Sequence, residues 1–250
     1  SFSVYRALSH VPVQYCIEMT NVIPGVSAAQ TPSSLLARMR ESSFRRLLNA
    51  LFSRIPFQMW GIRPAALSLA GGARSIEGWF PYPHDEKTKN LWAHTLDYDL
   101  YLNERDRPVA TDPKLGVFLD EYLPFHPDYR RLKLSPFSSP EAYYPGLRRF
   151  FDHLEREQGA RIVIAAHPHS RYEGHPYHFG GRSVVKGKTL ELVRKAGFVV
   201  AHSSTALKFA VLFEKPVAFI TTDSLQRSRR MASSIREAAS WLRKTPINVD

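Results

Sequence analysis

The sequence predicts an α/β protein whose second half is organised around a parallel sheet. Runs of branched apolar residues at 162–166, 198–201 and 217–220 have the composition of strands buried on both faces. Segments with helical spacing separate these runs, and strand-helix alternation is typical of a doubly wound parallel domain. We therefore expect one such domain over residues 112–250.

The first half is expected to hold a second α/β domain, over residues 1–111. Strands are predicted at 13–17 and 66–69, and residues 91–102 (LWAHTLDYDLYL) partly alternate as another strand would. Residues 35–52 combine apolar side chains at helical spacing with interspersed arginines. They predict either a covering helix with solvated arginines or a helix that lies on an acidic membrane surface.

The elements of the second half follow from periodicity and from helix boundary signals. The predicted strands are 115–119, 162–166, 198–201 and 217–220. Pro145 suits the first position of a helix that Gly159 ends, and Gly197 is expected to stop a helix at 189–196. Further helices are predicted at 206–213 and 233–243.

Composition limits the class of protein and of partner. The formal net charge is +11, from 34 Lys and Arg against 23 Asp and Glu, which favours anionic partners such as nucleic acid, acidic lipid or phosphorylated molecules. The single cysteine, Cys16, excludes an intrachain disulfide. No stretch approaches the roughly 20 apolar residues that span a bilayer, and no signal peptide is visible. We expect a cytoplasmic protein.

Polar clusters directly follow the predicted strands of the second half. They are Asp120 and Glu121, then His167, Pro168, His169, Ser170 and Arg171, then His202, Ser203, Ser204 and Thr205, then Thr221 and Thr222. Ligands of open α/β sheets bind beyond the carboxyl ends of the strands. If the strands share one sheet, these clusters face one cleft.

Each cluster has a functional and a purely structural interpretation. Ser203, Ser204 and Thr205 can bind a phosphate at a helix start or simply cap that helix. His167 can act as a general acid or phosphate donor, or it can be a structural histidine at a strand end. Asp120 and Glu121 are candidates for a general base, although paired acids in a loop are usually only solvated.

The residues expected as acceptor or loop contacts are Gly71, Gly72, His126, Thr221 and Thr222. Gly71 and Gly72 follow a predicted strand and permit either close approach to a ligand or a simple turn. His126, like His167, precedes a proline. No metal or cofactor is expected, because the histidines of residues 167–178 lack clustered carboxylate and cysteine partners.

The order of these motifs resembles bacterial sialyltransferases and related Kdo transferases, which are GT-B glycosyltransferases that use CMP-sugars. The segment AHPHSRYEG…VVAHSSTALKFAVLFEKPVAFI is also similar to CDP-glycerol glycerophosphotransferases and other surface-carbohydrate enzymes. The resemblance covers about residues 116–223 and implies two Rossmann-like domains with a cleft between them. The family pattern has a glycine after its two acids, where this sequence has Tyr122.

The resemblance also implies roles for individual residues. Asp120 or Glu121 would activate the acceptor hydroxyl, His167 would contact the nucleotide phosphate, and Ser203 and Ser204 would bind that phosphate without a metal. Residues 112–250 would bind the nucleotide sugar, and residues 1–111 would face a glycan acceptor, either free or lipid-linked, with peripheral contact to the inner membrane.

Three alternatives stay open from the sequence. The first is a CDP-linked polyol-phosphate transferase, and the second is a GT-B-shaped sugar-nucleotide epimerase. The third, from another class, is a basic nucleic-acid-binding protein. Against the third, the sequence has no helix-turn-helix, zinc or RNA-binding signature, and its basic residues are spread along the chain. We therefore expect no nucleic-acid partner.

Overall fold

The computed structural model describes residues 2–20, 57–72, 82–132, 134–175 and 177–250. The expected helix at 35–52 lies outside these residues. The chain divides into two units, Ser1–Thr95 and Leu96–Asp250. The division comes before residue 111, the expected boundary, because helix α4 (Leu96–Glu104) belongs to the second unit. Its Glu104 pairs with Arg194 at 2.7 Å.

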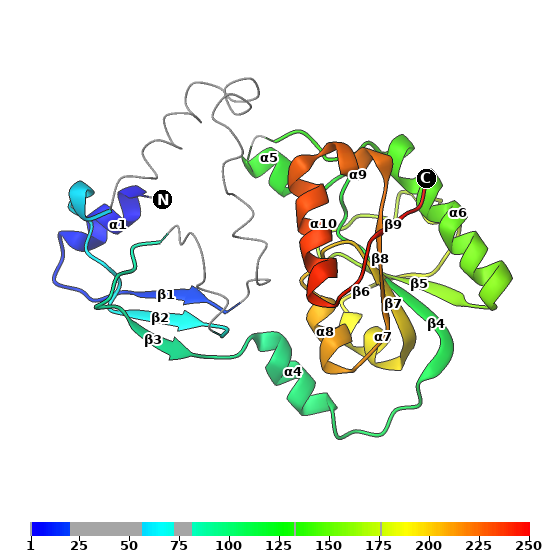
Figure 1. The fold of residues 1–250 in the computed structure, drawn as a ribbon, viewed down its shortest axis with the longest axis horizontal. Coiled ribbons are helices and arrows are strands. Elements are labelled where there is room, and N and C mark those ends of the chain that lie inside the picture. Colours follow the sequence, from blue (N-terminus) through cyan, green and yellow to red (C-terminus); the bar gives the residue numbers. More distant parts are fainter. Residues whose placement is uncertain (1, 21–56, 73–81, 133, 176) are drawn as a thin grey trace. The chain divides into compact units, whose positions relative to one another are not determined.

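The first unit contains a parallel sheet with the strand order β1-β2-β3 (Figure 1). Its described elements are α1 (Phe2–Ser9), β1 (Cys16–Met19), the 3-10 helix η2 (Phe57–Trp60), β2 (Leu67–Ala70) and β3 (Lys89–Trp92). The strands predicted at 13–17 and 66–69 are present with shifted ends. The strand predicted over 91–102 is wrong beyond residue 92, because Asp97 and Asp99 begin a helix whose amino end favours acids.

The second unit is built on a parallel sheet with the strand order β6-β5-β4-β7-β8-β9. The strands are β4 (Asp112–Leu119), β5 (Arg161–Ala166), β6 (Val184–Lys186), β7 (Ala196–Ala201), β8 (Val217–Thr221) and β9 (Ile247–Asn248). Strands β5 and β6 lie on one side of β4, and strands β7, β8 and β9 lie on the other. This is the order of a Rossmann-like domain, so the parallel α/β prediction is confirmed for this unit.

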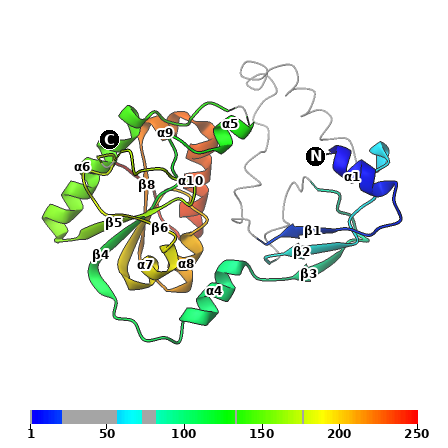
Figure 2. The same cartoon turned by 180° about the vertical axis from the view of Figure 1, so that it is seen from behind.

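Helices cover both faces of this sheet (Figure 2). They are α5 (Asp128–Leu132), α6 (Pro140–Gln158), α7 (Thr189–Lys195), α8 (Leu207–Leu212), α9 (Asp223–Arg227) and α10 (Arg229–Trp241). Phe118 and Ile164 pack with α6 and α9 on one face, whereas Val117 and Val163 pack with α7 and α8 on the other. The central segments, residues 115–119 of β4 and 162–166 of β5, are apolar because both of their sides are buried.

The helix boundaries predicted from Pro145 and from Gly197 are wrong. Helix α6 begins at Pro140, after the capping side chain of Ser139, and Pro145 lies inside it; Gly159 ends it at φ 59° as expected. Gly197 does not stop a helix but lies within β7. A Cβ at Gly197 would lie 2.4 Å from the carbonyl oxygen of Pro113, so glycine permits close approach of β4.

Candidate functional site

The polar clusters meet at the carboxyl ends of three adjacent strands. β4 lies between β5 and β7 in the sheet, and it pairs with both. The strands that follow β4 in the sequence are added on one side of it up to β6, and from β7 onward they are added on the other side. The ends of β4 and β7 are therefore the topological switch point, where such sheets bind ligands. The expectation that the four predicted strands share one sheet is confirmed.

A direct contact joins the two strand ends at this point. The backbone N–H of Ser203 donates to Oε1 of Glu121 at 2.7 Å, and the Ser203 hydroxyl donates to Oε2 at 3.4 Å. Burial raises the pKa of Glu121 to about 7, and the negative charge of Asp120 raises it further. The hydrogen bonds from Ser203 act in the opposite direction and lower this pKa. A carboxylate with this pKa is suited to proton exchange near neutral pH.

Asp120 has a different environment from its neighbour. It is only 4% exposed, and its oxygens accept hydrogen bonds from the backbone N–H of Tyr122, the Tyr172 hydroxyl and the backbone N–H of His167. Burial raises its pKa to about 6, although these three bonds act in the opposite direction. Asp120 therefore ties the end of β4 to the start of the loop after β5, while Glu121 lines a cavity.

Tyr122 occupies the left-handed backbone region, at φ 53°. Glycine is favoured in this region because it has no Cβ to clash with the following carbonyl. The Tyr122 ring packs edge-on against Tyr172, with 5.2 Å between the ring centroids. The chain thus turns sharply directly after its two acids.

His167 and His126 form a close pair of imidazoles, with ring centroids 4.9 Å apart. The Nδ1 atom of each accepts a backbone N–H, from His169 at 3.2 Å and from Asp128 at 3.2 Å respectively. Each neutral ring therefore carries its proton on Nε2 and can donate from it. Burial and the neighbouring histidines lower the pKa of His167 to about 4.

These side chains line a cavity of about 300 Å³. His167 from the loop after β5 and the Ser203–Thr205 segment after β7 share it with Glu121. The remaining lining residues are Leu123, His126, Asp128, Tyr129, Leu134, Phe137, Arg230, Met231 and Ser234. The cavity combines two carboxylates, two imidazoles, hydroxyls and one arginine, which can exchange a proton and bind an anion.

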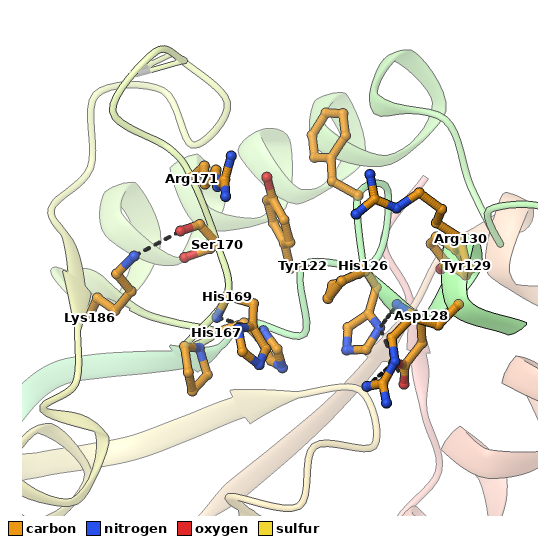
Figure 3. Close-up of a pocket in the computed structure, with 14 residues that line it drawn as sticks. Tyr122, His126, Asp128, Tyr129, Arg130, His167, His169, Ser170, Arg171 and Lys186 are labelled. Atoms are coloured by element: carbon orange, nitrogen blue, oxygen red, sulfur yellow. Dashed lines mark hydrogen bonds and ion pairs between the residues drawn. The ribbon is translucent and has the colours of Figure 1, made fainter.

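A second, larger cavity of about 1010 Å³ adjoins the first and shares His126, His167, Asp128 and Tyr129 with it. We call it the basic cavity. Figure 3 shows Lys186, Ser170 and Arg171 on one side, with Arg130 on the other. Pro168, His169, Ser170 and Arg171, the residues after His167 in the predicted cluster, all line it.

Several predicted site residues lie away from both cavities. His202 is wholly buried, donates from Nδ1 to the Ile220 carbonyl at 2.7 Å and accepts the Tyr143 hydroxyl at 2.8 Å through Nε2. Its prediction as a phosphate ligand is wrong, because both nitrogens are used within the core. Thr222 is also buried, and its hydroxyl caps α9 by accepting the Leu225 N–H.

The other positions predicted as acceptor or loop contacts have separate outcomes. Thr221 is 6% exposed in β8 and lines neither cavity. Gly71 and Gly72 follow β2 in the first unit, where a Cβ at Gly71 would lie 3.0 Å from the Thr20 carbonyl oxygen. His126 does line both cavities, from the loop before α5.

The predicted capping role of the serines is only partly present. Helix α8 begins at Leu207, one residue later than expected, and its N-cap Ala206 has no side chain able to cap. Ser204 Oγ accepts the Ala206 N–H at 3.3 Å, whereas the Ser203 side chain contacts Glu121 instead. With only six residues in α8, the helix dipole supplies little of the anion site, which depends on side chains.

Sequence reasoning did not find several lining residues. Arg230 and Ser234 enter from α10, whose amino end was predicted four residues too late, at 233. Arg130 and Arg131 come from the short helix α5, in a proline-rich segment without periodicity. The sequence feature that could have indicated them is a pair of adjacent arginines close to the His126-Pro127 step. Lys186 lies on β6, a strand too short to predict.

Neither a scan against protein-family models nor a search of the curated proteins finds a match for this chain. Within the described residues, no group of three or more His, Cys, Asp or Glu side chains is placed to hold a metal ion. None of the helices in the same residues has the length and apolar character needed to cross a bilayer.

Proposed function

We propose that the chain is a glycosyltransferase that moves a sugar from a nucleotide donor, first of all a CMP-sugar, to a hydroxyl acceptor. The observation that carries this proposal is that Glu121, His167, Ser203 and Ser204 line one cavity at the switch point of the sheet. They supply a base, an imidazole donor and two hydroxyls, which are the groups that such a transfer uses at its acceptor and its leaving group.

Glu121 is the general base in this proposal. Its Oε1 atom is held by the Ser203 N–H at 2.7 Å, whereas Oε2 has only a 3.4 Å contact and can accept a proton. The acceptor hydroxyl gives its proton to Glu121 as its oxygen attacks the anomeric carbon. With a pKa of about 7, Glu121 is ionised in a large fraction of molecules at neutral pH.

The leaving phosphate lies between His167 and the two serines. The bond between the anomeric carbon and the phosphate oxygen breaks, and the negative charge that develops accepts hydrogen bonds from His167 Nε2–H and the serine hydroxyls. Because Nδ1 of His167 accepts the His169 N–H, the neutral ring carries its proton on Nε2, the donating atom in this proposal. Arg230, at the same cavity, adds a positive charge.

The backbone at Tyr122 supports the resemblance to CMP-sugar transferases. That family has a glycine after its two acids, and Tyr122 has the left-handed φ of 53° that glycine favours. Tyr122 therefore adopts a backbone conformation that a glycine at this position would also accept. The resemblance further implies a surface polysaccharide or a lipid-linked glycan as the acceptor.

Donor hydrolysis tests the proposal without knowledge of the acceptor. The 250-residue chain is incubated with CMP-, CDP- and UDP-linked sugars and with CDP-glycerol, and nucleotide release is measured. We expect release of CMP from a CMP-sugar, and loss of that release in Glu121→Gln or His167→Ala. Turnover of a UDP-sugar alone contradicts the CMP assignment, and turnover of CDP-glycerol alone supports the polyol-phosphate transferase. If no donor reacts and random oligonucleotides bind in a salt-sensitive way, the chain is a nucleic-acid-binding protein.

A further inference from the structure

The basic cavity has a marked excess of positive charge. Its lining includes four cations against one carboxylate, that of Asp128, and three imidazoles add N–H donors. The cations are Arg130, Arg131, Arg171 and Lys186, and the imidazoles are His126, His167 and His169. These side chains come from α5, the loop after β5 and β6, so three separate segments bring positive charge to one space.

Protein carboxylates neutralise little of this charge. In the described parts of the chain, no carboxylate lies within 4.0 Å of the guanidinium of Arg130 or of Arg171. Lys186 donates to the Ser170 carbonyl at 2.9 Å and reaches exposed Glu173 only at 3.9 Å. Arg131 is 3.5 Å from Asp128. Cations grouped without partners repel one another, and a bound anion relieves that repulsion.

The proposed position of the nucleotide phosphate provides no anionic partner for Arg130 and Arg171. In the proposed function, which this inference extends, the phosphate is held by His167 and the serines in the smaller cavity. A nucleoside monophosphate carries its negative charge on that phosphate alone, so Arg130 and Arg171, which have no carboxylate partner among the described residues, require another anionic group. The volume of about 1010 Å³ also exceeds the space that a single phosphate fills.

We propose that the basic cavity is a second anion site, which binds a phosphate, sulfate or carboxylate group of the acceptor while the nucleotide occupies the smaller cavity. The two cavities share His126 and His167, so an acceptor whose hydroxyl reaches Glu121 can extend past these rings into the basic cavity. The enzyme then selects acceptors that carry a negative charge near the reacting hydroxyl.

Inorganic pyrophosphate is the probe for this site, measured by calorimetry with the chain saturated by CMP. We expect pyrophosphate to bind the CMP complex, and to bind about tenfold more weakly to Arg171→Ala/Lys186→Ala and to Arg130→Ala/Arg131→Ala. The CMP affinity of both variants should stay within about twofold of the parent. Lys195→Ala/Lys244→Ala removes two exposed lysines outside both cavities and is the charge-matched control.

Each result decides the proposal. Displacement of pyrophosphate by CMP, or equal pyrophosphate binding by the parent and both arginine variants, overturns the second site. A carboxylated donor, CMP-N-acetylneuraminate, should leave pyrophosphate binding intact; if it competes where CMP does not, the site belongs to the donor sugar and the acceptor assignment is wrong. If CMP fails to bind but pyrophosphate still depends on Arg171 and Lys186, the proposed function fails while the anion site stands.

Discussion

Glu121 and Ser203 are 82 positions apart in the sequence, yet the backbone N–H of Ser203 donates to the Glu121 carboxylate at 2.7 Å. The contact joins the carboxyl ends of β4 and β7, at the topological switch point of the sheet. It fixes one oxygen of the base and brings the serine hydroxyls to the same cavity. In the proposed function, proton transfer and phosphate binding would therefore both take place at the ends of β4 and β7.

Glu121→Gln separates the chemical role of this residue from its role in the fold. The pKa of about 7 means that ionising Glu121 in the folded chain costs free energy, and the cost appears as pH rises from about 4.5 through about 7. We expect the variant to lose about a thousandfold in transfer rate, and to gain about 1 to 2 kcal/mol of stability at pH 8 with little change at pH 4.

Rates at saturating donor and denaturant unfolding at both pH values check this prediction. Gln keeps an oxygen that can accept the Ser203 N–H, so the fold is preserved. Full activity in the variant, or a loss of stability at pH 8, would contradict the assignment of Glu121 as a base with a raised pKa.

Asp120→Asn tests whether the buried acid sets the pH dependence of the reaction. The negative charge of Asp120 contributes to the raised pKa of Glu121, and the base must be ionised to act. We expect the parent rate to rise with pH through about 7, and the rise to move to lower pH in the variant. The pH profile of donor turnover checks it; a profile that keeps its midpoint while the rate falls indicates a purely structural role.

His167→Ala tests the leaving-group contact. Removal of the Nε2–H donor should lower donor turnover by about a hundredfold or more, because the developing charge loses a hydrogen bond. His153→Ala is the matched control, since His153 is exposed on α6 and should retain parental turnover. Equal rates for the two variants would exclude His167 from the reaction.

Tyr143→Phe tests the correction made for His202. The Tyr143 hydroxyl is the donor to Nε2 of this wholly buried ring, and its removal leaves that nitrogen unsatisfied. We expect a loss of about 1 to 3 kcal/mol of stability, measured by urea unfolding, with an unchanged CMP affinity. A weakened CMP affinity in a chain that remains folded would return His202 to the binding site.

The sheet of the second unit could be predicted because its strands are buried on both faces. Continuous apolar runs such as 162–166 identify strands of this kind, and Gly159 marks the end of a helix through its left-handed conformation. Gly197 is also a glycine at the end of a helical pattern, but it lies in a strand and allows that strand to approach Pro113 closely. A glycine alone does not distinguish these uses, because close approach depends on a neighbour distant in sequence.

The candidate site was predictable in part for a related reason. Strand-end residues such as Glu121 and His167 follow directly from the strand positions, and both line the smaller cavity. His202 also follows a strand, but its ring points into the core. Successive side chains of a strand point to opposite faces, so an error of one residue in the predicted strand end reverses the predicted direction of His202. Arg230 comes from a helix whose amino end was misplaced, since Ser228 caps it five residues before the predicted start at 233.

The most direct test of the central claim, that loops distant in sequence hold one phosphate, is a double-mutant cycle on CMP affinity with His167→Ala and Ser204→Ala. Calorimetry of the parent, both single variants and the double variant provides the four dissociation constants. If both side chains contact the same phosphate, each single variant weakens CMP and the two effects couple by about 0.5 kcal/mol or more. Additive effects, or equal CMP binding by all four chains, would contradict the claim.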